Sequence, residues 1–292
     1  MSLIELHVET NVEHADALSD QLTLLGAHAI TFQDAGDQPL YEPKPGALDL
    51  WPTLKMIGLF DETLSVEAIL AFLKEQQRSE HIKEFSIKKI VDQDWERACL
   101  ESFKPMPFGK RLWICPSWQT PPDPLAVNLI LDPGLAFGTG THPTTSLCLT
   151  WLEQHIQPQQ SVIDYGCGSG ILGLAALKLG AKKVIAVDHD TQALEATQKN
   201  AARNHMTPKQ LITCLPRDLP TPLKADLLIA NILARPLIEL AESFASMTTH
   251  QLLLSGILYE QIDSIISAYS TWFKQIESIR QDEWAALYFM KK

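Results

Sequence analysis

The sequence predicts an α/β protein that combines a large parallel β-sheet with a smaller α+β domain in front of it. Three observations support this prediction. Residues 161–173 read as a short apolar strand, a glycine-rich turn and the start of a helix. After this turn, short apolar strands alternate with helix-like segments, which is typical of a parallel sheet covered by helices. Before it, residues 1–90 contain several segments in which polar and apolar residues alternate, as in half-buried strands.

Residues 1–90 predict four strands and two helices in the order β-α-β-β-α-β, which is the order of a ferredoxin-like sandwich. The strands are expected at residues 2–9, 27–34, 54–60 and 81–90, and the helices at residues 12–25 and 65–77. This part contains 15 Asp and Glu but only 7 Lys and Arg, so it contributes −8 to the formal net charge of −11. The acidic excess allows two interpretations, a merely soluble surface or a docking face for a basic macromolecule.

A helix predicted at residues 92–104 connects the two domains, so the expected ranges are 1–90, a helical linker at 91–104, and 105–292. The second domain is expected to contain strands at residues 111–116, 125–133, 162–163, 184–188, 210–214, 226–230, 251–257, 274–281 and 283–290, with the last pair antiparallel. Helices are expected at residues 191–204, with Thr191 as the N-cap, and at residues 234–244 and 259–269.

The composition limits the class of protein. No apolar run approaches the ~20 residues of a membrane span, and the first residues lack the basic and apolar stretches of a signal peptide. The five cysteines are odd in number and form no CxxC pair, which argues against a disulfide framework and for a reducing compartment. The negative charge disfavours binding of nucleic acid by bulk electrostatics. We therefore expect a soluble, monomeric, cytoplasmic protein without metal.

Three alternating glycines, Gly166, Gly168 and Gly170, form the turn after the strand at residues 162–163. Glycine permits positive φ and lets a ligand lie against the backbone. The run from Gly168 matches the dinucleotide fingerprint G-x-G-x-x-G. Asp164, however, would oppose a pyrophosphate at this strand tip, whereas it suits a ligand with an ammonium and a sulfonium group. Asp188 follows the next strand at about the ~20-residue distance from which an acid accepts ribose hydroxyls.

The run D-x-G-x-G-x-G at residues 164–170 resembles the first motif of class I S-adenosylmethionine (AdoMet) methyltransferases. A longer match is more specific. LDPGLAFGTGTHPTT at residues 131–145, then VIDYGCGSGILG, VIAVD and LIANIL, resemble the ribosomal protein L-eleven methyltransferase family, whose members methylate amino groups of that large-subunit protein. The resemblance covers residues 90–292 by motif and the N-terminal domain by layout. It implies a Rossmann-like, seven-stranded class I methyltransferase sheet behind a ferredoxin-like substrate-recognition domain.

The resemblance also implies which residues contact AdoMet, namely Thr145, Gly166, Asp188 and Asn231. Supporting positions in the cofactor loops are Asp164, Gly168, Gly170, Phe137, Gly138 and Thr144. Asn231 has three open roles, since it could contact the cofactor, orient the incoming amine, or cap the following helix. Asn-Ile-Leu-Ala stands at this strand end where some amino-methyltransferases carry Asn-Pro-Pro-Tyr, which puts amine orientation by that full motif in doubt. His142, which precedes a proline, is interpreted as structural rather than as a general base.

The expected function is transfer of methyl groups from AdoMet to lysine side chains, or to the N-terminal amine, of the large-subunit ribosomal protein eleven. Two alternatives stay open. The first is an AdoMet-dependent methyltransferase that acts on RNA or on another protein, although the acidic charge disfavours RNA. The second is an NAD-dependent oxidoreductase, which would leave Asp164 and residues 131–145 unexplained.

Overall fold

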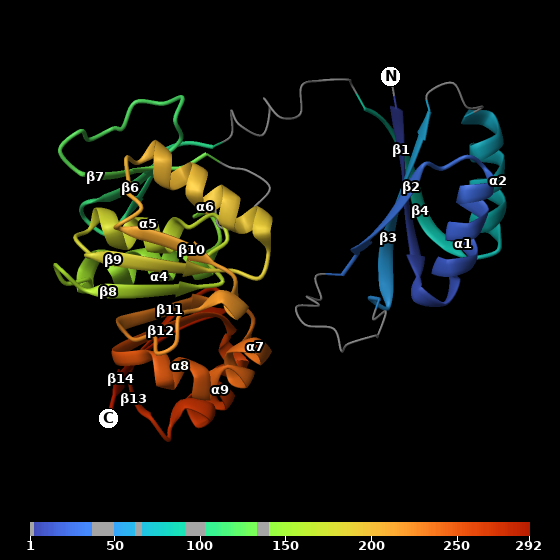
Figure 1. Ribbon diagram of the computed structural model, residues 1–292. Helices are drawn as coiled ribbons and strands as arrows, with labels where there is room; N and C mark the ends of the chain where they lie inside the picture. The colour runs from blue at the N-terminus through green and yellow to red at the C-terminus, as the bar shows by residue number, and fades with distance from the viewer. Residues whose placement is uncertain (1–2, 37–49, 62–65, 91–102, 133–139) are drawn as a thin grey trace. The chain divides into compact units, whose positions relative to one another are not determined.

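The computed structural model describes residues 3–36, 50–61, 66–90, 103–132 and 140–292 (Figure 1). The chain divides into two compact units, Met1–Ala98 and Cys99–Lys292. Most of the segment predicted as a helical linker, residues 91–102, lies outside the described residues, so that prediction is not tested. No helix in the described parts of the chain is long and apolar enough to cross a membrane.

The N-terminal unit is a four-stranded antiparallel sheet in the order β2-β3-β1-β4, with two helices on one face (Figure 1). Its elements are β1 (Leu3–Asn11), α1 (Val12–Leu24), β2 (Ala29–Asp34), β3 (Thr53–Asp61), α2 (Val66–Arg78) and β4 (Ile82–Ile90). Buried and partly exposed residues alternate along β1. Its buried side chains, such as Leu6 and Val8, share a core with Leu18 of α1 and Leu73 of α2. The predicted order of six elements is confirmed.

A small sheet of three short strands opens the C-terminal unit, in the order β5-β6-β7. Its strands are β5 (Met106–Phe108), β6 (Leu112–Cys115) and β7 (Val127–Ile130). Strand β5 was not expected, because it is three residues long and contains Pro107. A proline can be accommodated there because β5 is an edge strand.

The outer edge of β7 is closed by a side chain. The amide of Asn204 accepts a hydrogen bond from the N–H of Ile130 at 2.9 Å and donates one to the carbonyl of Ile130 at 2.6 Å. The side chain thus pairs with Ile130 as a neighbouring strand would, because a strand also offers one donor and one acceptor. Both polar groups of Ile130 are satisfied by this contact.

The main sheet has seven strands in the order β10-β9-β8-β11-β12-β14-β13. Its strands are β8 (Ser161–Tyr165), β9 (Lys183–Val187), β10 (Leu211–Cys214), β11 (Ala225–Asn231), β12 (Thr248–Leu258), β13 (Phe273–Gln281) and β14 (Trp284–Lys291). The first five strands in that order are parallel, and β14 is antiparallel to both of its neighbours. The order reverses between β8 and β11, which creates the switch point where α/β proteins bind ligands.

Helices cover both faces of this sheet (Figure 1). One hydrophobic cluster includes Leu149 of α4 (Pro143–His155), Leu174 of α5 (Ile171–Lys178) and Ala201 of α6 (Thr191–Arg203). The other cluster includes Leu237 of α7 (Ala234–Glu239), Phe244 of α8 (Ala241–Met247) and Ile265 of α9 (Ile262–Tyr269). The seven-stranded α/β prediction is confirmed, and burial on both faces explains why the parallel strands are almost continuously apolar.

Two helix predictions need correction. Helix α6 is capped by Asp190 rather than Thr191, since the Asp190 carboxylate accepts the N–H of Gln192 at 2.8 Å and Thr191 is the first helical residue. The segment expected as one helix at residues 234–244 is two short helices, α7 and α8, that meet at Leu240. The local sequence is compatible with either Asp190 or Thr191 as the N-cap of α6, because both side chains can accept hydrogen bonds from the first N–H groups of a helix.

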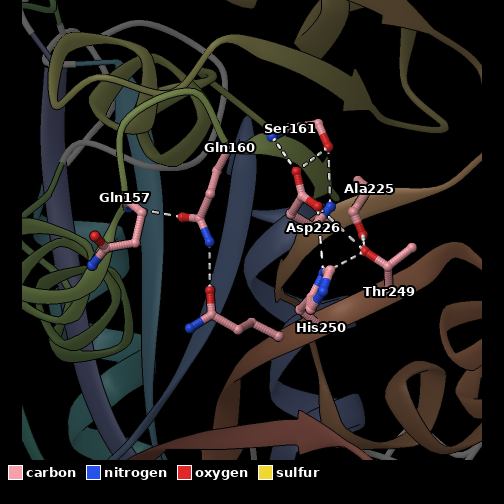
Figure 2. Close-up of polar contacts among 8 residues, drawn as sticks. Gln157, Gln160, Ser161, Ala225, Asp226, Thr249 and His250 are labelled. Atoms are coloured by element: carbon pink, nitrogen blue, oxygen red, sulfur yellow. Dashed lines mark hydrogen bonds and ion pairs between the residues drawn. The ribbon is translucent and has the colours of Figure 1, made fainter.

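A polar network joins β8, β11 and β12 where these strands begin, at the edge of the sheet opposite the glycine turn (Figure 2). Ser161 donates its N–H and its hydroxyl to one oxygen of Asp226, at 2.9 and 2.7 Å. Thr249 donates to the carbonyl of Ala225 at 3.0 Å, and His250 lies 3.4 Å from the other Asp226 oxygen. The hydrogen bond from the Ser161 N–H holds the pKa of Asp226 below its usual range. The network stabilises the beginnings of the three strands.

Candidate active site

The candidate site lies at the carboxyl edge of the main sheet, beside the switch point between β8 and β11. Tyr165, Val187 and Ala230 are register partners there, so the segments that follow β8, β9 and β11 begin at the same edge. Gly166 and Asp188 directly follow β8 and β9, and Asn231 is the last residue of β11. Three of the four residues expected to contact a cofactor are thus placed together by strand order alone.

The glycine turn requires glycine at two positions for reasons visible in the structure. Gly166 and Gly170 have positive φ angles of 77° and 80°. A Cβ atom on Gly166 would lie 2.3 Å from Cγ2 of Ile232, and one on Gly170 would lie 2.8 Å from the Thr197 side chain. The N–H of Gly166 also donates to the carbonyl of Val187 at 2.7 Å. A side chain at either position would therefore push the turn away from its neighbours.

Asp188 ties the turn after β8 to the turn after β9. One carboxylate oxygen accepts the N–H of Gly168 at 2.9 Å, and the other accepts the N–H of Asp190 at 3.0 Å. The side chain is largely buried. Each carboxylate oxygen can accept a further hydrogen bond, because a carboxylate offers about four lone-pair sites. Asp188 is thus held rigidly and keeps acceptor capacity for a ligand.

Asp164 is the second acidic residue at this edge, and it is almost completely buried, with 1% of its surface exposed. Its Oδ2 accepts the N–H of Gly173 at 2.8 Å, whereas its Oδ1 has no hydrogen-bond partner among the described residues. Burial raises the pKa of Asp164 to about 7. The hydrogen bond from Gly173 lowers this pKa, and the negative charge of Asp188 raises it. Ionised Asp164 is therefore costly unless a positive charge comes close.

Thr145 and Asn231 are brought together from α4 and β11. The side-chain amide of Asn231 donates to the hydroxyl oxygen of Thr145 at 3.3 Å, and Thr145 itself is buried. Leu233, not Asn231, is the N-cap residue of α7. The helix-cap interpretation of Asn231 is therefore wrong, and its side chain instead contacts Thr145 at the carboxyl end of β11.

His142 and Thr144 form the start of α4. The Nδ1 atom of His142 accepts the N–H of Thr144 at 3.3 Å and lies 2.7 Å from the Thr144 hydroxyl oxygen. Burial lowers the pKa of His142, which favours the neutral ring. His142 acts as the N-cap of this helix, which agrees with the structural interpretation. The supporting positions Phe137 and Gly138 lie outside the described residues.

Two further residues of the site were missed by sequence reasoning. Gly256 in β12 has a φ of 83°, and a Cβ atom there would lie 2.3 Å from the carbonyl oxygen of Ile232. A glycine inside an apolar strand is a signal of such a close approach. Thr197 on α6 donates its hydroxyl hydrogen to the carbonyl of Gly168 at 3.0 Å. No local pattern distinguishes Thr197 from an ordinary polar residue of an amphipathic helix.

Whether side chains of the described residues could bind a metal ion at this edge depends on how they are arranged. Within the described ranges, no group of three or more His, Cys, Asp or Glu side chains is arranged to hold a metal ion. The acidic residues Asp164 and Asp188 instead bind backbone N–H groups. The site thus combines a shaped glycine turn, two buried carboxylates and the Thr145–Asn231 pair.

Comparisons of the sequence and of the structure with known proteins indicate the same family. A sequence model described as "Ribosomal protein L11 methyltransferase (PrmA)" matches residues 2–292. Proteins named ribosomal protein L11 methyltransferase from Marinobacter nauticus and Shewanella halifaxensis are 47% and 48% identical to the chain, with 98% and 100% of both chains covered. A solved ribosomal protein L11 methylase from Lactobacillus delbrueckii subsp. bulgaricus is 36% identical, with a TM-score of 0.59, and the match covers 65% of this chain and 100% of that one. The large unit therefore has the class I methyltransferase fold, and the chain belongs to the ribosomal protein L11 methyltransferase family.

Proposed function

We propose that this protein transfers methyl groups from AdoMet to lysine side chains, or to the N-terminal amine, of the large-subunit ribosomal protein for which its relatives are named. The observation that carries the proposal is the pair of buried carboxylates beside the glycine turn, one bound to Gly168 and the other to Gly173 of α5, in a chain that belongs to this family. A ligand that carries positive charge suits two carboxylates, whereas a dinucleotide pyrophosphate would be repelled by them. AdoMet, with its ammonium and sulfonium groups, is such a ligand.

Oδ1 of Asp164 has no hydrogen-bond partner in the part of the chain that the structure describes, which supports the fit of a cationic ligand. A buried acceptor without a donor is unfavourable, and a positive charge nearby would offset the cost of ionising it. Gly166 would give the ligand close access to the backbone, and Asp188 would accept the ribose hydroxyls. Thr145 and Asn231 would border the ligand on the α4 side. When bound, AdoMet supplies the activated methyl group.

Methyl transfer to an amine requires alignment more than acid–base catalysis, because the reaction is an in-line displacement. A lysine amine with its reference pKa of ~10.4 costs ~4.6 kcal/mol to deprotonate at pH 7. A desolvated pocket and a nearby positive charge both lower that pKa. His142 is not our candidate base, because its Nδ1 is engaged with Thr144. We assign no general base.

Residues 1–90 are proposed to recognise the substrate protein, and residues 105–292 to bind AdoMet. The acidic excess of the N-terminal part complements a basic ribosomal protein. The core of the N-terminal unit consists of its own side chains, which is consistent with a separate recognition module. We further propose that the protein acts as a monomer in the cytoplasm, without binding nucleic acid directly.

The decisive experiment is incubation of the purified protein with methyl-labelled AdoMet and separate acceptors. The acceptors are the purified large-subunit ribosomal protein, ribosomal RNA, and an unrelated basic protein of similar size. Label in lysines or the N-terminal amine of the ribosomal protein, located by mass spectrometry, is the expected result. Label in RNA or equally in both proteins would contradict the proposed substrate. Calorimetric titration with AdoMet and with NAD separately tests the cofactor.

A further inference from the structure

Helix α6 carries a buried polar face toward the glycine turn. Thr197 and Asn200 of α6 and its C-cap residue Asn204 are spaced by three and four residues, so their side chains lie on one side of the helix. All three are buried, with at most 5% of their surface exposed. Buried polar side chains are costly unless they are hydrogen-bonded, so the partners of this face indicate its purpose.

Two of these residues bind successive carbonyl groups of the turn. The hydroxyl of Thr197 donates to the carbonyl of Gly168 at 3.0 Å. The amide of Asn200 donates to the carbonyl of Ser169 at 2.9 Å. Both peptide carbonyls are therefore directed toward α6.

Packing restricts the turn from the same side. The Thr197 hydroxyl oxygen lies 3.5 Å from the sulfur of Cys167, and Thr197 leaves no room for a Cβ atom on Gly170. From a different element, Asp188 accepts the N–H of Gly168. The Gly168 peptide groups are thus held by hydrogen bonds from two directions. A glycine-rich segment can adopt many backbone conformations. The contacts with Thr197 and Asp188 restrict the turn to one of these conformations before a ligand binds.

We propose that Thr197 and Asn200 are positioning residues for the cofactor site, which hold the glycine turn in its binding shape by fixing the carbonyls of Gly168 and Ser169. The inference rests on the proposed function, because it assumes that AdoMet lies against this turn. Neither side chain needs to touch the ligand. Loss of these hydrogen bonds would reduce the fraction of molecules whose glycine turn has the binding conformation. The apparent affinity for AdoMet would fall in proportion to that fraction. Turnover at saturating AdoMet would change little.

The test compares two identical substitutions. Thr197→Val removes the hydroxyl that binds Gly168 and preserves the shape of the side chain. Thr248→Val is the matched control, because the Thr248 hydroxyl is also buried and donates to a backbone carbonyl, that of Phe244, at 2.7 Å. Thr248 begins β12 and so lies at the opposite edge of the sheet. Thr197→Ser restores a hydroxyl, and Asn200→Ala is a second, independent disruption of the turn.

AdoMet dissociation constants are measured by calorimetry at a temperature where melting curves show each variant to be folded. Thr197→Val and Asn200→Ala should each raise the dissociation constant roughly five- to tenfold and raise KM similarly, with kcat within about twofold. Thr197→Ser should recover most of the affinity. Thr248→Val should lower the melting temperature by a similar amount and leave the dissociation constant unchanged.

Three results separate the possible failures. If Thr197→Val and Asn200→Ala bind AdoMet as tightly as wild type, the polar face serves only the fold and the inference is overturned. If Thr248→Val weakens binding as much as Thr197→Val does, the effect is general destabilisation, and the inference is again overturned. If the wild-type protein binds no AdoMet, the proposed function fails first, and the inference fails with it.

Discussion

The side-chain amide of Asn231 donates to the hydroxyl oxygen of Thr145 at 3.3 Å, across 86 residues of sequence. One residue ends β11 and the other lies in the first turn of α4, so the contact fixes this helix against the crevice edge of the sheet. Asn231 is therefore oriented before a ligand binds. Its amide oxygen is the group still to be assigned, to the cofactor or to the amine that is methylated.

We expect Asn231→Ala to weaken AdoMet binding about tenfold, while saturating AdoMet restores most of the turnover. The reason is that a group that holds the cofactor contributes equally to the ground state and the transition state. Binding is measured by calorimetry and turnover by methyl release from AdoMet. If turnover falls and affinity stays within about threefold of wild type, Asn231 orients the amine instead.

Asp188→Ala should raise the AdoMet dissociation constant roughly ten- to hundredfold, which corresponds to the ~1.5–3 kcal/mol of charge-assisted hydrogen bonds. The variant should also melt at a lower temperature, because two backbone N–H groups lose their acceptor. Asp190→Ala is the matched control. It removes the cap of α6, which costs about 1 kcal/mol of stability. Unchanged affinity in Asp188→Ala would exclude a ribose contact.

Asp164 should make the stability of the ligand-free protein fall as pH rises. Its folded-state pKa of about 7 lies above the ordinary aspartate pKa of 3.8 expected in the unfolded chain, so the folded state binds more protons between these values. The stabilisation of the neutral acid is fully present below pH ~4 and is lost as pH rises through ~7, by an amount on the order of 4 kcal/mol. Melting temperatures of wild type and Asp164→Asn from pH 4 to 8 provide the measurement. Parallel curves for the two proteins would contradict the prediction.

Asp164 should also couple AdoMet binding to the release of a proton. A cationic ligand favours ionised Asp164, so binding near pH 6.5 should release a proton and become tighter as pH rises toward 7.5. Calorimetric titrations in two buffers with different ionisation enthalpies count the protons released. Asp164→Asn should release fewer protons than wild type. An equal number in both proteins would assign the proton to another group.

Removal of residues 1–90 should leave AdoMet affinity within about threefold of wild type and abolish methylation of the ribosomal protein. Each unit has a hydrophobic core made of its own residues, as expected of a domain that can fold alone. Calorimetry reports cofactor binding, and transfer of label reports methylation. Retained methylation of the ribosomal protein in the truncated chain would disprove a recognition role for residues 1–90.

The sequence predicted most of the fold because its strong signals are local. The pattern around Gly166 and Asp188 marks two strand ends, and parallel strand ends meet at one edge of a sheet. Strand β5 was missed because three residues with Pro107 give almost no periodic signal. The position of the α6 cap depended on a one-residue choice between Asp190 and Thr191, which only tertiary packing decides.

The site residues that the sequence did not predict are recognised only from contacts between distant segments of the chain. Thr197 and Asn200 have the pattern of polar residues on a helix, and nothing in the neighbouring sequence indicates that residues 29 and 31 positions earlier lie against them. Likewise, Oδ1 of Asp164 lacks a partner among the described residues because the side chain is buried, and the sequence indicates this burial only in part. Sequence patterns identify the groups at a site, and packing decides which of them still lack a partner.

The contact between Asn204 and Ile130 has a consequence for solubility. A strand at the edge of a sheet can recruit a strand from a second molecule through its unpaired N–H and C=O groups. At Ile130 the amide of Asn204 already occupies both groups. The side chain thereby blocks intermolecular strand addition at this point of β7. Replacement of Asn204 with an apolar residue would expose these groups, and the protein would be expected to self-associate through this edge at high concentration.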